Sequence, residues 1–573
     1  MNLREVAPPP PSPVPAGLLD EAETVTGALE QLVRRFPDFA CLTFLARDRT
    51  EARMTLGHLW IRAQSVHAAL AAAGIRRGDF VVLVLPTGPE LLAAYFGTML
   101  AGGVPTLLAP PSNRFAAEDV YRDRLGFLLG HSGARALVCD DEVAALVATS
   151  EHLARATVLT PARIPRPATL PDPSPARADD IAMAQYSSGS TGTPKGVLLS
   201  QRAVLNNVRA TRDGFRLAPS DIAVNWLPLY HDLGLIDAFL LPILAGAPAV
   251  LIPTMDFMRA PSLWLWALHH YGGTVALAPN FAYALSAQRI PDDELTGLDL
   301  GAWRIAFNGS EPVLAPTLAA FGARFARYGL RPTALVSGWG LAESVCISTV
   351  HPLGEAVRVE TIDRQALATD GRARVTSGDG LASVSVGTAL PGVEIAIRDA
   401  AHATLPERHV GTIWLRSTSL FIGYHRAPGV TAKALVDGWL DTGDQGYLAG
   451  GHLYFVAREK DLIVIGGEKY APHDVETAIG RVSGVRAGCA VAFGVIDPTR
   501  GTEDVAAVVE THETDPAARA ALGDAIRTAV MHDTGLALRH VVLVPPGGVE
   551  KTTSGKLARR ATRDRYADAF TAK

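Results

Sequence analysis

The sequence predicts an α/β protein built on parallel sheets, followed by a β-rich part and a separate C-terminal α+β part. Three observations support this prediction. Short apolar runs alternate with amphipathic segments up to about residue 380, short strands between turns follow, and the pattern changes again near residue 458. Alternating buried strands and helices are typical of parallel sheets that are covered on both faces.

The elements of the first part are expected in a regular order. Helices are expected at 58–73, 89–100, 261–271 and 316–328, and strands at 80–85, 135–139, 249–252, 274–278 and 304–307. The strand segments are short and apolar, whereas the helical segments carry apolar residues on one face. Such a series predicts a parallel sheet that helices cover on both faces.

The remainder of the chain predicts two further units. Strands at 393–397 and 411–415 indicate a β-rich subdomain at about 385–459, and strands at 489–493 and 505–510 with a helix at 516–532 indicate a C-terminal domain at 460–573. The N-terminal domain is therefore expected at 21–459. Residues 1–20 form a proline-rich leader that is expected to be poorly ordered.

Composition excludes several classes of protein. The chain has 573 residues, of which 48% are hydrophobic and 19% charged, so a disordered or fibrous chain is excluded. Its formal net charge of −5 gives no support for nucleic-acid binding through a broad basic surface. The uncharged stretch 238–255 is interrupted by prolines, which favours a buried turn and strand over a membrane span.

The four cysteines and the N-terminus bear on the compartment. The cysteines are far apart and match neither a disulfide framework nor paired zinc ligands, at positions Cys41, Cys139, Cys346 and Cys489. The first 16 residues contain no basic region followed by an apolar run, so they do not read as a secretory signal. Free thiols in a reducing compartment predict a cytoplasmic protein.

The strongest local motif is the segment YSSGSTGTPKGV at 186–197. Its glycines permit close backbone approach, Lys195 adds a cation, and its hydroxyl groups come from Ser187, Ser188, Ser190, Thr191 and Thr193. A loop of this kind can surround a polyphosphate with N–H and O–H donors. It differs from the P-loop pattern because threonine and proline separate the last loop glycine from the lysine.

This loop resembles the phosphate loop of adenylate-forming enzymes, the superfamily of acyl-CoA ligases, luciferases and nonribosomal-peptide adenylation domains. Five further segments resemble that superfamily in the expected order along the chain. They are NGSEP at 308–312, GWGLAE at 338–343, WLDTGD at 439–444, REKD at 458–461 and KTTSGKLAR at 551–559. The resemblance implies the superfamily's α/β fold. This fold has a large N-terminal domain of two αβ subdomains plus a β-rich subdomain, and a small mobile C-terminal α+β domain.

The resemblance also implies roles for single residues. Lys556, Glu343 and Lys195 are expected to be catalytic, with Glu343 as the Mg²⁺ ligand and Lys460 as the hinge. The expected ATP and AMP contacts also include Asn308, Gly309, Ser310, Glu311, Gly338, Trp339, Gly340, Asp444 and Arg458. These roles suit the chemistry, because attack of a carboxylate on the α-phosphorus of ATP brings two anions together and needs cations already in place. The superfamily more often has tyrosine at 339 and proline at 550, where this chain has tryptophan and Glu550.

Three features resemble the fatty acyl-AMP ligase branch. The segments WLPLYHDLGL at 226–235 and APNFAY at 278–283 resemble the acyl-pocket motifs of that branch. Ala342 is also the residue type that the branch has before the glutamate at the position of Glu343. Residues 357–383 resemble the insertion that is thought to limit domain rotation in that branch; an ordinary surface loop is the alternative. Acyl-pocket residues are then expected at Trp226, His231, Asn280, Phe281 and Tyr283. The large aromatic residues of this expected pocket are equally consistent with a place in the hydrophobic core. For His231, a structural or pocket-gating role is preferred.

The expected function is ATP-dependent activation of a fatty or related carboxylic acid to acyl-AMP, with ATP and Mg²⁺. The acyl group would pass to the phosphopantetheine thiol of an acyl carrier protein or a carrier domain of polyketide or lipopeptide synthesis. Basic residues that could meet such a partner are Arg527, Arg539, Arg559, Arg560 and Arg563. Two alternatives stay open: an acyl- or aryl-CoA ligase, and a protein that binds acyl ligands or carrier proteins without adenylating.

Overall fold

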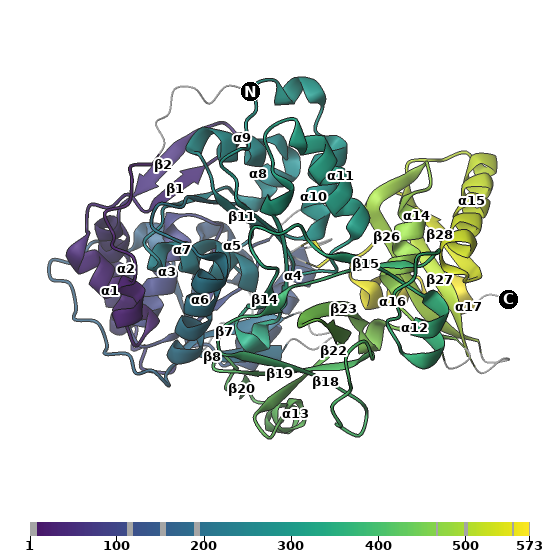
Figure 1. Ribbon diagram of the computed structural model, residues 1–573. Coiled ribbons are helices and arrows are strands. Elements are labelled where there is room, and N and C mark those ends of the chain that lie inside the picture. Colours follow the sequence, from purple (N-terminus) through teal and green to yellow (C-terminus); the bar gives the residue numbers. More distant parts are fainter. Residues whose placement is uncertain are drawn as a thin grey trace.

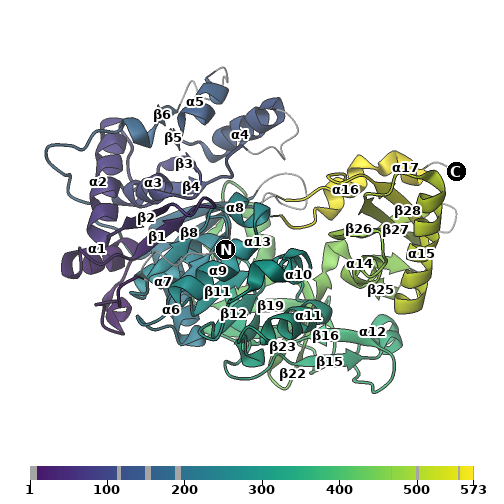
Figure 2. The same ribbon diagram turned by 90° about the horizontal axis from the view of Figure 1, so that it is seen from above.

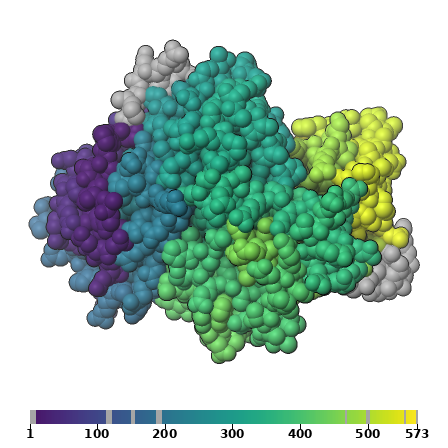
Figure 3. All heavy atoms as spheres, viewed as in Figure 1, coloured from purple at the N-terminus to yellow at the C-terminus, as the bar shows by residue number. Residues whose placement is uncertain are grey.

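The computed structural model describes residues 9–111, 118–148, 156–187, 195–465, 468–497, 502–552 and 555–571. The chain forms a large N-terminal domain and a smaller C-terminal domain, which lies at one end of the molecule next to α10 (Asn280–Arg289), α11 (Ala315–Ala326) and α12 (Arg364–Asp370) (Figures 1 and 2). In the space-filling view the yellow-green C-terminal domain is in contact with the teal and green parts of the larger domain (Figure 3).

A nine-stranded sheet forms the centre of the N-terminal domain. Its order is β17-β14-β13-β12-β11-β9-β10-β1-β2, and pairing is parallel from β13 across to β1. The strands are β1 (Leu42–Leu45), β2 (Glu51–Met54), β9 (Ala223–Asn225), β10 (Ala249–Leu251), β11 (Val275–Ala278), β12 (Ile305–Asn308), β13 (Leu335–Gly340), β14 (Ile347–Val350) and β17 (Thr388–Ala389). Parallel central strands are covered on both faces, which explains their nearly uniform apolar sequences.

A second sheet of four parallel strands has the order β4-β3-β5-β6. All residues of β3 are buried, as its sequence FVVLV predicts. The strands are β3 (Phe80–Val84), β4 (Val104–Leu107), β5 (Ala136–Cys139) and β6 (Thr157–Leu159), and the nearby helices are α2 (Leu56–Ala72), α3 (Pro89–Leu100), α4 (Glu118–Ser132) and α5 (Asp141–Val147). The N-terminal domain therefore contains two separate parallel sheets, each with helices beside it.

Helix starts in this domain follow local sequence signals. The Ser200 hydroxyl accepts a hydrogen bond from the Ala203 amide at the start of α6 (Gln201–Phe215), and Thr24 does the same for Gly27 in α1 (Val25–Arg35). Such side chains satisfy amides that have no partner within the helix. The other helices here are α7 (Leu241–Leu244), α8 (Thr254–Arg259) and α9 (Ser262–Tyr271).

The β-rich part contains two antiparallel sheets and the expected insertion. One sheet has the order β18-β19-β22-β21 with β23 on β22, and the other has the order β20-β8-β7. Their strands are β7 (Ile181–Ser187), β8 (Lys195–Ser200), β18 (Val393–Arg398), β19 (Gly411–Ser417), β20 (Gly423–Tyr424), β21 (Leu435–Val436), β22 (Trp439–Ala449) and β23 (His452–Arg458), with α13 (Pro428–Ala434) alongside. The insertion forms β15 (Val359–Ile362), α12 and β16 (Leu381–Val384), and β15 pairs with β16.

The C-terminal domain has its own sheet and its own cores. Strand β27 lies between β26, which is antiparallel to it, and β28, which is parallel. Each buried cluster here draws its members from residues after 460. The elements are β24 (Ile463–Ile465), β25 (Glu468–Tyr470), α14 (Pro472–Gly480), β26 (Val485–Asp497), β27 (Thr502–Thr511), α15 (Pro516–Thr534), β28 (Leu538–Val544), α16 (Arg559–Arg565) and α17 (Ala567–Thr571).

Two expectations need correction. The leader is not loose over residues 9–20: Val14, Leu18 and Leu19 are buried in the main core, and the Ser12 hydroxyl donates to the Gly246 carbonyl. A Cβ on Gly246 would lie 2.5 Å from Val14, so a glycine is needed where the leader crosses. The stretch 238–255 contains helical turns as well as the expected strand, because a π-helix at 233–240 runs into α7 before β10. In the described part of the chain, no helix is long and apolar enough to cross a membrane.

Candidate active site

Lys556 brings the two domains together at the candidate site. Its Nζ lies 3.0 Å from Nε2 of His231 and donates to the Ser310 hydroxyl at 3.3 Å, and both partners belong to the N-terminal domain. Burial lowers the pKa of Lys556, and the negative charges of Asp232 and Glu311 oppose this effect. The structure therefore places the expected catalytic lysine in a partly buried position with two oriented partners.

The segment that carries Lys556 is fixed at both ends. Lys551 and Leu557 form an antiparallel bridge, and the Lys556 amide donates to the Thr552 hydroxyl. Gly555 has φ of 89°, and a Cβ there would contact the Phe281 ring of α10 at 3.5 Å. A left-handed glycine at this point lets the segment turn into the site.

A buried carboxylate of the C-terminal domain holds the start of this segment. Glu510 accepts hydrogen bonds from the amides of Gly547 and Val549 at 2.9 and 3.0 Å, and it forms an ion pair with Arg486. Burial opposes its ionisation, but these contacts hold the pKa of Glu510 below its usual value. Glu510 lies on β27 and is only 1% exposed. Its hydrogen bonds to the Gly547 and Val549 amides hold the backbone that leads into the Lys556 segment.

His231 makes a second polar contact on its other ring nitrogen. Its Nδ1 lies 2.5 Å from Oδ1 of Asp232, and that oxygen also accepts from the Leu233 amide at 2.7 Å. Burial opposes ionisation of Asp232, yet its contacts with His231 and Lys556 hold the pKa of this carboxyl well below its usual range. Lys556, His231 and Asp232 thus form a continuous polar chain at the start of the π-helix.

Glu343 is held by a residue that sequence reasoning missed. The Tyr424 hydroxyl donates to Oε1 of Glu343 at 2.7 Å, and the Lys195 ammonium lies 4.9 Å from the centre of the Tyr424 ring. Burial and the neighbouring Glu343 charge raise the pKa of Tyr424, so the hydroxyl stays a donor. Its only sequence signal is an aromatic residue after glycine on β20, which does not by itself indicate a site.

Trp339 and Asp444 are directly connected. The indole Nε1 donates to Oδ2 of Asp444 at 2.9 Å, and Arg458 Nε lies 3.5 Å from the other oxygen, Oδ1. Asp444 and Arg458 are also register partners on β22 and β23. Burial raises the pKa of Asp444, whereas Arg458 and the indole donor favour its charged form. These three expected nucleotide contacts therefore form one group.

The expected adenine segment has a tightly packed backbone. A Cβ on Gly338 would lie 2.4 Å from the Phe307 ring, and one on Gly340 would lie 1.9 Å from the Cys346 carbonyl oxygen. A Cβ on Gly309 would also meet Phe307, at 2.7 Å. Close packing thus explains why glycine is needed at these three positions, whether or not a nucleotide binds there.

Asn308 and Glu311 lie at the carboxyl end of β12, where Asn308 is buried and Glu311 is partly buried. Asn308 donates to Oδ1 of Asn280, and its own Oδ1 has no hydrogen-bond partner in the structure. Glu311 accepts from the Phe281 amide at 2.5 Å, and burial raises its pKa although that amide and Lys556 oppose the shift. Glu311 is thus directed toward the start of α10, and its nucleotide contact stays a prediction.

The expected acyl-pocket residues fall into two groups. Trp226 stacks on Phe257 with ring centres 3.8 Å apart and meets Phe281 edge-on, so these rings form one aromatic cluster. Tyr283 is fully buried and donates to the Phe307 carbonyl, and Asn280 braces the 308–314 turn through the Leu314 amide. Tyr283 and Asn280 thus support the core and a loop, which agrees with the alternative that such residues have a structural role.

Several expected residues have little or no description at the site. Ser188, Ser190, Thr191 and Thr193 lie outside the described residues, and Ser187 is described only by its backbone pairing with Lys195. Lys460 is in a short 3₁₀ helix, Glu459–Asp461, between β23 and the C-terminal domain. Burial, followed by the nearby positive charge of Arg458, lowers the pKa of Lys460. Its role as a hinge stays a prediction.

The donors fit a magnesium ion that is held mainly by substrate. Within the described ranges, no group of three or more His, Cys, Asp or Glu side chains could hold a metal ion. Glu343 supplies one carboxylate whose Oε1 is fixed by Tyr424. Mg²⁺ commonly binds through one or two carboxylates together with substrate phosphates and water, so a single oriented carboxylate is compatible with it.

Comparison with known proteins gives the class of the molecule. A family model described as AMP-binding enzyme matches residues 29–425. A putative acyl-CoA synthetase of Caulobacter vibrioides is 34% identical over 558 residues, covering 93% of this chain and 96% of that protein. The long-chain-fatty-acid–AMP ligase FadD26 of Mycobacterium marinum is 31% identical over 582 residues, covering 95% of this chain and 97% of that protein.

Solved structures agree with these sequence matches. A structure from a study of fatty acyl-adenylate ligases of E. coli and L. pneumophila has a TM-score of 0.91 and 31% identity, covering 98% of this chain and 100% of that chain. A fatty acyl-adenylate ligase of L. pneumophila, in complex with acyl adenylate and pyrophosphate, has a TM-score of 0.75 and 28% identity, covering 96% and 97%. The fold is that of adenylate-forming enzymes, and the chain belongs to the family of AMP-binding enzymes.

Proposed function

We propose that this protein activates a fatty or related carboxylic acid with ATP to give acyl-AMP and pyrophosphate, and then passes the acyl group to the phosphopantetheine thiol of a carrier protein. The observation that carries the proposal is the placement of Lys556. A partly buried lysine of the C-terminal domain contacts His231 and Ser310 of the N-terminal domain, at the end of β12. The fatty acid–AMP ligases among its relatives support the substrate class.

Each residue of the site has a defined task in adenylation. Lys556 supplies a compact positive charge where the carboxylate meets the α-phosphate, and its burial strengthens that charge's effect. Asp444 and Arg458 hold the ribose, and Trp339 provides a stacking surface. Glu343 would hold a magnesium ion, which supplies charge compensation for the phosphates. The carboxylate substrate is already ionised at neutral pH, so this half-reaction needs no general base.

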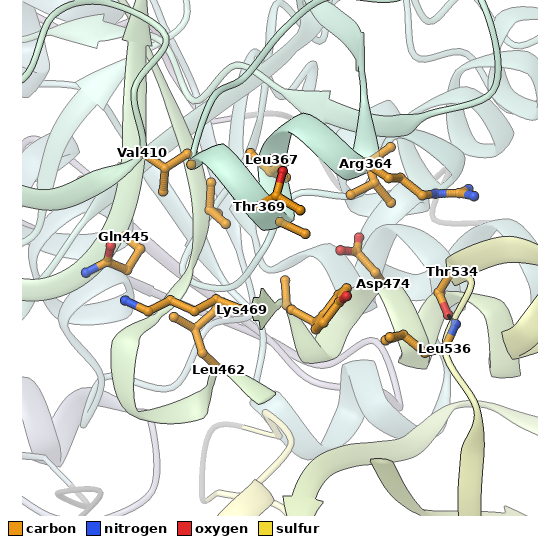
Figure 4. A pocket seen from close by; sticks show the side chains of 16 residues that line it. Arg364, Leu367, Thr369, Val410, Gln445, Leu462, Lys469, Asp474, Thr534 and Leu536 are labelled. Atoms are coloured by element: carbon orange, nitrogen blue, oxygen red, sulfur yellow. Dashed lines mark hydrogen bonds between the residues drawn. The ribbon is translucent and has the colours of Figure 1, made fainter. Parts of the chain in front are cut away.

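The insertion supports a carrier-protein acceptor rather than CoA. Figure 4 shows Arg364, Leu367 and Thr369 of α12 opposite Lys469 and Asp474 of the C-terminal domain, across a cavity of about 280 Å³. Partial burial raises the pKa of Asp474, and His473 and Arg364 oppose that effect. An insertion that contacts the mobile domain in this arrangement could restrain the rotation that CoA chemistry requires.

The insertion is also tied to the β-rich subdomain. Arg408 makes a two-armed hydrogen-bonded pair with Glu360 of β15, at 2.9 and 3.0 Å. Ile362 of β15 packs with Tyr447 and Tyr454 in a separate small core. A planar guanidinium paired with a carboxylate in this way fixes orientation as well as distance. The insertion would thus restrain the C-terminal domain while it is itself anchored to the β-rich subdomain.

The experiment is a mass-spectrometric product assay. The enzyme, ATP, Mg²⁺ and a panel of carboxylic acids are incubated alone, with CoA, and with a phosphopantetheinylated carrier protein. Acyl-AMP that persists beside CoA and is consumed by the carrier protein supports the proposal. Efficient acyl-CoA formation would instead identify an acyl-CoA ligase, and no ATP–pyrophosphate exchange with any acid would favour the non-adenylating alternative.

The role of the insertion is tested by loosening its contact. Deletion of residues 357–383, or the single change Leu367→Asp at the cavity wall, should raise acyl-CoA formation if the contact restrains rotation. Gln365 is exposed on the same helix and does not line the cavity, so Gln365→Asp is the matched control. No gain in acyl-CoA from a folded Leu367→Asp protein would remove the insertion from the explanation.

The candidate basic residues for a carrier-protein surface are mostly paired with carboxylates of the C-terminal domain. Arg559 is removed from the candidate basic patch, because it pairs with Glu476 and Asp461 inside the C-terminal domain. Arg560 and Arg563 both lie near Asp564, so their charge is partly compensated. Arg527 and Arg539 pair with Asp524 and Asp504.

We propose a cytoplasmic protein that serves polyketide or lipopeptide synthesis.

A further inference from the structure

We infer that His231 is the general base of the acyl-transfer half-reaction, that Asp232 positions it, and that Lys556 occupies it until adenylation is complete. This inference rests on the proposed function, because it assigns residues to the second half-reaction. It changes the role of His231 from a structural or gating residue to a catalytic one. Three contacts on the two ring nitrogens of His231 and on Asp232 carry it.

The geometry already contains an oriented imidazole. Nδ1 of His231 faces Oδ1 of Asp232 at 2.5 Å, so this nitrogen is the one that bears hydrogen and Nε2 is left as the acceptor. Asp232 is fixed in turn by the Leu233 amide at 2.7 Å. Asp232 is partly buried, with 17% of its side chain exposed. A base whose second nitrogen is held by a carboxylate is the arrangement that activates nucleophiles in Ser-His-Asp enzymes.

The backbone around the pair is rigid. The His231 amide donates to the Pro228 carbonyl, and the His231 carbonyl accepts from the Leu235 amide. A Cβ on Gly234 would lie 2.1 Å from the Pro228 carbonyl oxygen, so the turn is closed tightly before the π-helix. All eight residues of that helix are buried. The imidazole is therefore held by packing as well as by hydrogen bonds.

Lys556 shows that Nε2 borders the reacting centre. Its ammonium lies 3.0 Å from Nε2 and is the group that meets the carboxylate and α-phosphate during adenylation. In that state the lone pair of Nε2 is occupied by an ammonium donor. When the C-terminal domain swings away, Lys556 leaves, and the same lone pair is exposed beside the acyl carbonyl that the thiol must attack.

The transfer step needs a base, unlike the first step. The thiol of phosphopantetheine has a pKa near that of an ordinary thiol, about 8.5, and the thiolate is the nucleophile. The S–H proton passes to Nε2 of His231, sulfur bonds to the acyl carbon, and the bond from that carbon to the phosphate oxygen breaks to release AMP. Asp232 stabilises the imidazolium, which later gives its proton to water. Other ionisable groups acting on this cluster are Glu311, Asp237, Cys346 and Arg458.

The test starts from supplied acyl-AMP, so it does not depend on adenylation. Transfer to a phosphopantetheinylated carrier protein, and to pantetheine itself, is followed by mass spectrometry in single turnovers from pH 6 to pH 9. His231→Gln keeps an acceptor for Lys556 but removes the base, and Asp232→Asn keeps an acceptor for the Leu233 amide but removes the charge. His532→Gln is the control, because His532 and Asp533 form an exposed pair of the same kind, 2.8 Å apart.

We expect His231→Gln to slow transfer about 100-fold at pH 7, the lower end of what a general base contributes. The deficit should shrink toward pH 9, where the thiol ionises without help. Asp232→Asn should slow transfer by about 10-fold with the same pH dependence. A residue that only shaped the pocket would lower transfer equally at every pH.

The outcomes separate this inference from the proposed function. Transfer by His231→Gln at the wild-type rate throughout the pH range, or a deficit that stays constant with pH, would overturn the inference while leaving the proposed function intact. Failure of the wild-type enzyme to transfer to either thiol would overturn the proposed acceptor and, with it, the base. Circular dichroism of each variant establishes that it is folded before rates are compared.

Discussion

The indole nitrogen of Trp339 donates a hydrogen bond of 2.9 Å to Oδ2 of Asp444, although the two residues are 105 positions apart in the chain. Position 339 is where this chain departs from the tyrosine that is more usual in the superfamily. The tryptophan ring keeps an aromatic face, and its Nε1 also reaches a carboxylate on β22. The tryptophan thus links two segments that are expected to bind the nucleotide.

Trp339→Phe should therefore weaken ATP binding more than it lowers turnover. Phenylalanine keeps a ring for stacking but removes the donor to Asp444, and hydrogen bonds to charged groups contribute about 1.5–3 kcal/mol. We expect the KM for ATP to rise by about 10-fold or more. Because loss of the donor raises the pKa of Asp444 further, the acid limb of the ATP–pyrophosphate exchange profile should move to higher pH. An unchanged KM would mean that the contact plays no part in ATP binding.

Tyr424→Phe should lower adenylation by about 10-fold and increase the Mg²⁺ concentration needed for half-maximal rate. The change removes the 2.7 Å hydrogen bond to Glu343 but keeps the ring beneath Lys195. A carboxylate without its orienting donor holds a metal less firmly. The measurement is a magnesium titration of pyrophosphate exchange, with Tyr328→Phe at a partly exposed site as the control. Identical titrations of mutant and wild type would contradict the prediction.

Asp237→Asn should stabilise the protein above neutral pH. Asp237 is 1% exposed on the π-helix, and burial raises its pKa to about 7. A carboxyl with a folded-state pKa above its unfolded value contributes most favourably below the unfolded pKa, near 4. That contribution is lost as the pH rises through about 7, at a cost of up to about 4 kcal/mol.

The check is urea unfolding of both proteins at pH 5 and pH 8. The wild type should lose stability over this interval relative to Asp237→Asn, with Asp370→Asn on exposed α12 as the control. Parallel pH dependence of wild type and Asp237→Asn would show that the carboxyl does not titrate in this window.

Glu510→Gln should destabilise the C-terminal domain and impair adenylation together. The change leaves Arg486 without its buried charged partner and weakens the acceptor for the Gly547 and Val549 amides. Breaking such a buried pair costs about 3–5 kcal/mol. The exposed pair of Arg565 and Glu550 is the matched control, since Arg565→Gln should cost at most about 1 kcal/mol. Thermal unfolding and pyrophosphate exchange are the measurements.

Much of the fold could be predicted from the sequence because it is locally encoded. The apolar run that forms β3 and the segment that forms α3, Pro89–Leu100, are marked by periodicity and by proline at the first turn. Strand β26 was predicted only in its apolar middle. It extends to Val485–Asp497 because β27 pairs along its length, including polar residues that the pattern does not mark.

The site divides in the same way. The sequence by itself determined the family and the order of the segments that carry Lys556, Glu343 and Asp444, because the motifs that mark the family are short runs of neighbouring residues. Only the tertiary structure decided that Tyr424 holds Glu343 and that residues 9–20 pack on the core. It also decided that Lys556 meets His231 across 325 positions. Such contacts depend on how strands and domains are placed in space, and no local pattern of residue types carries that information.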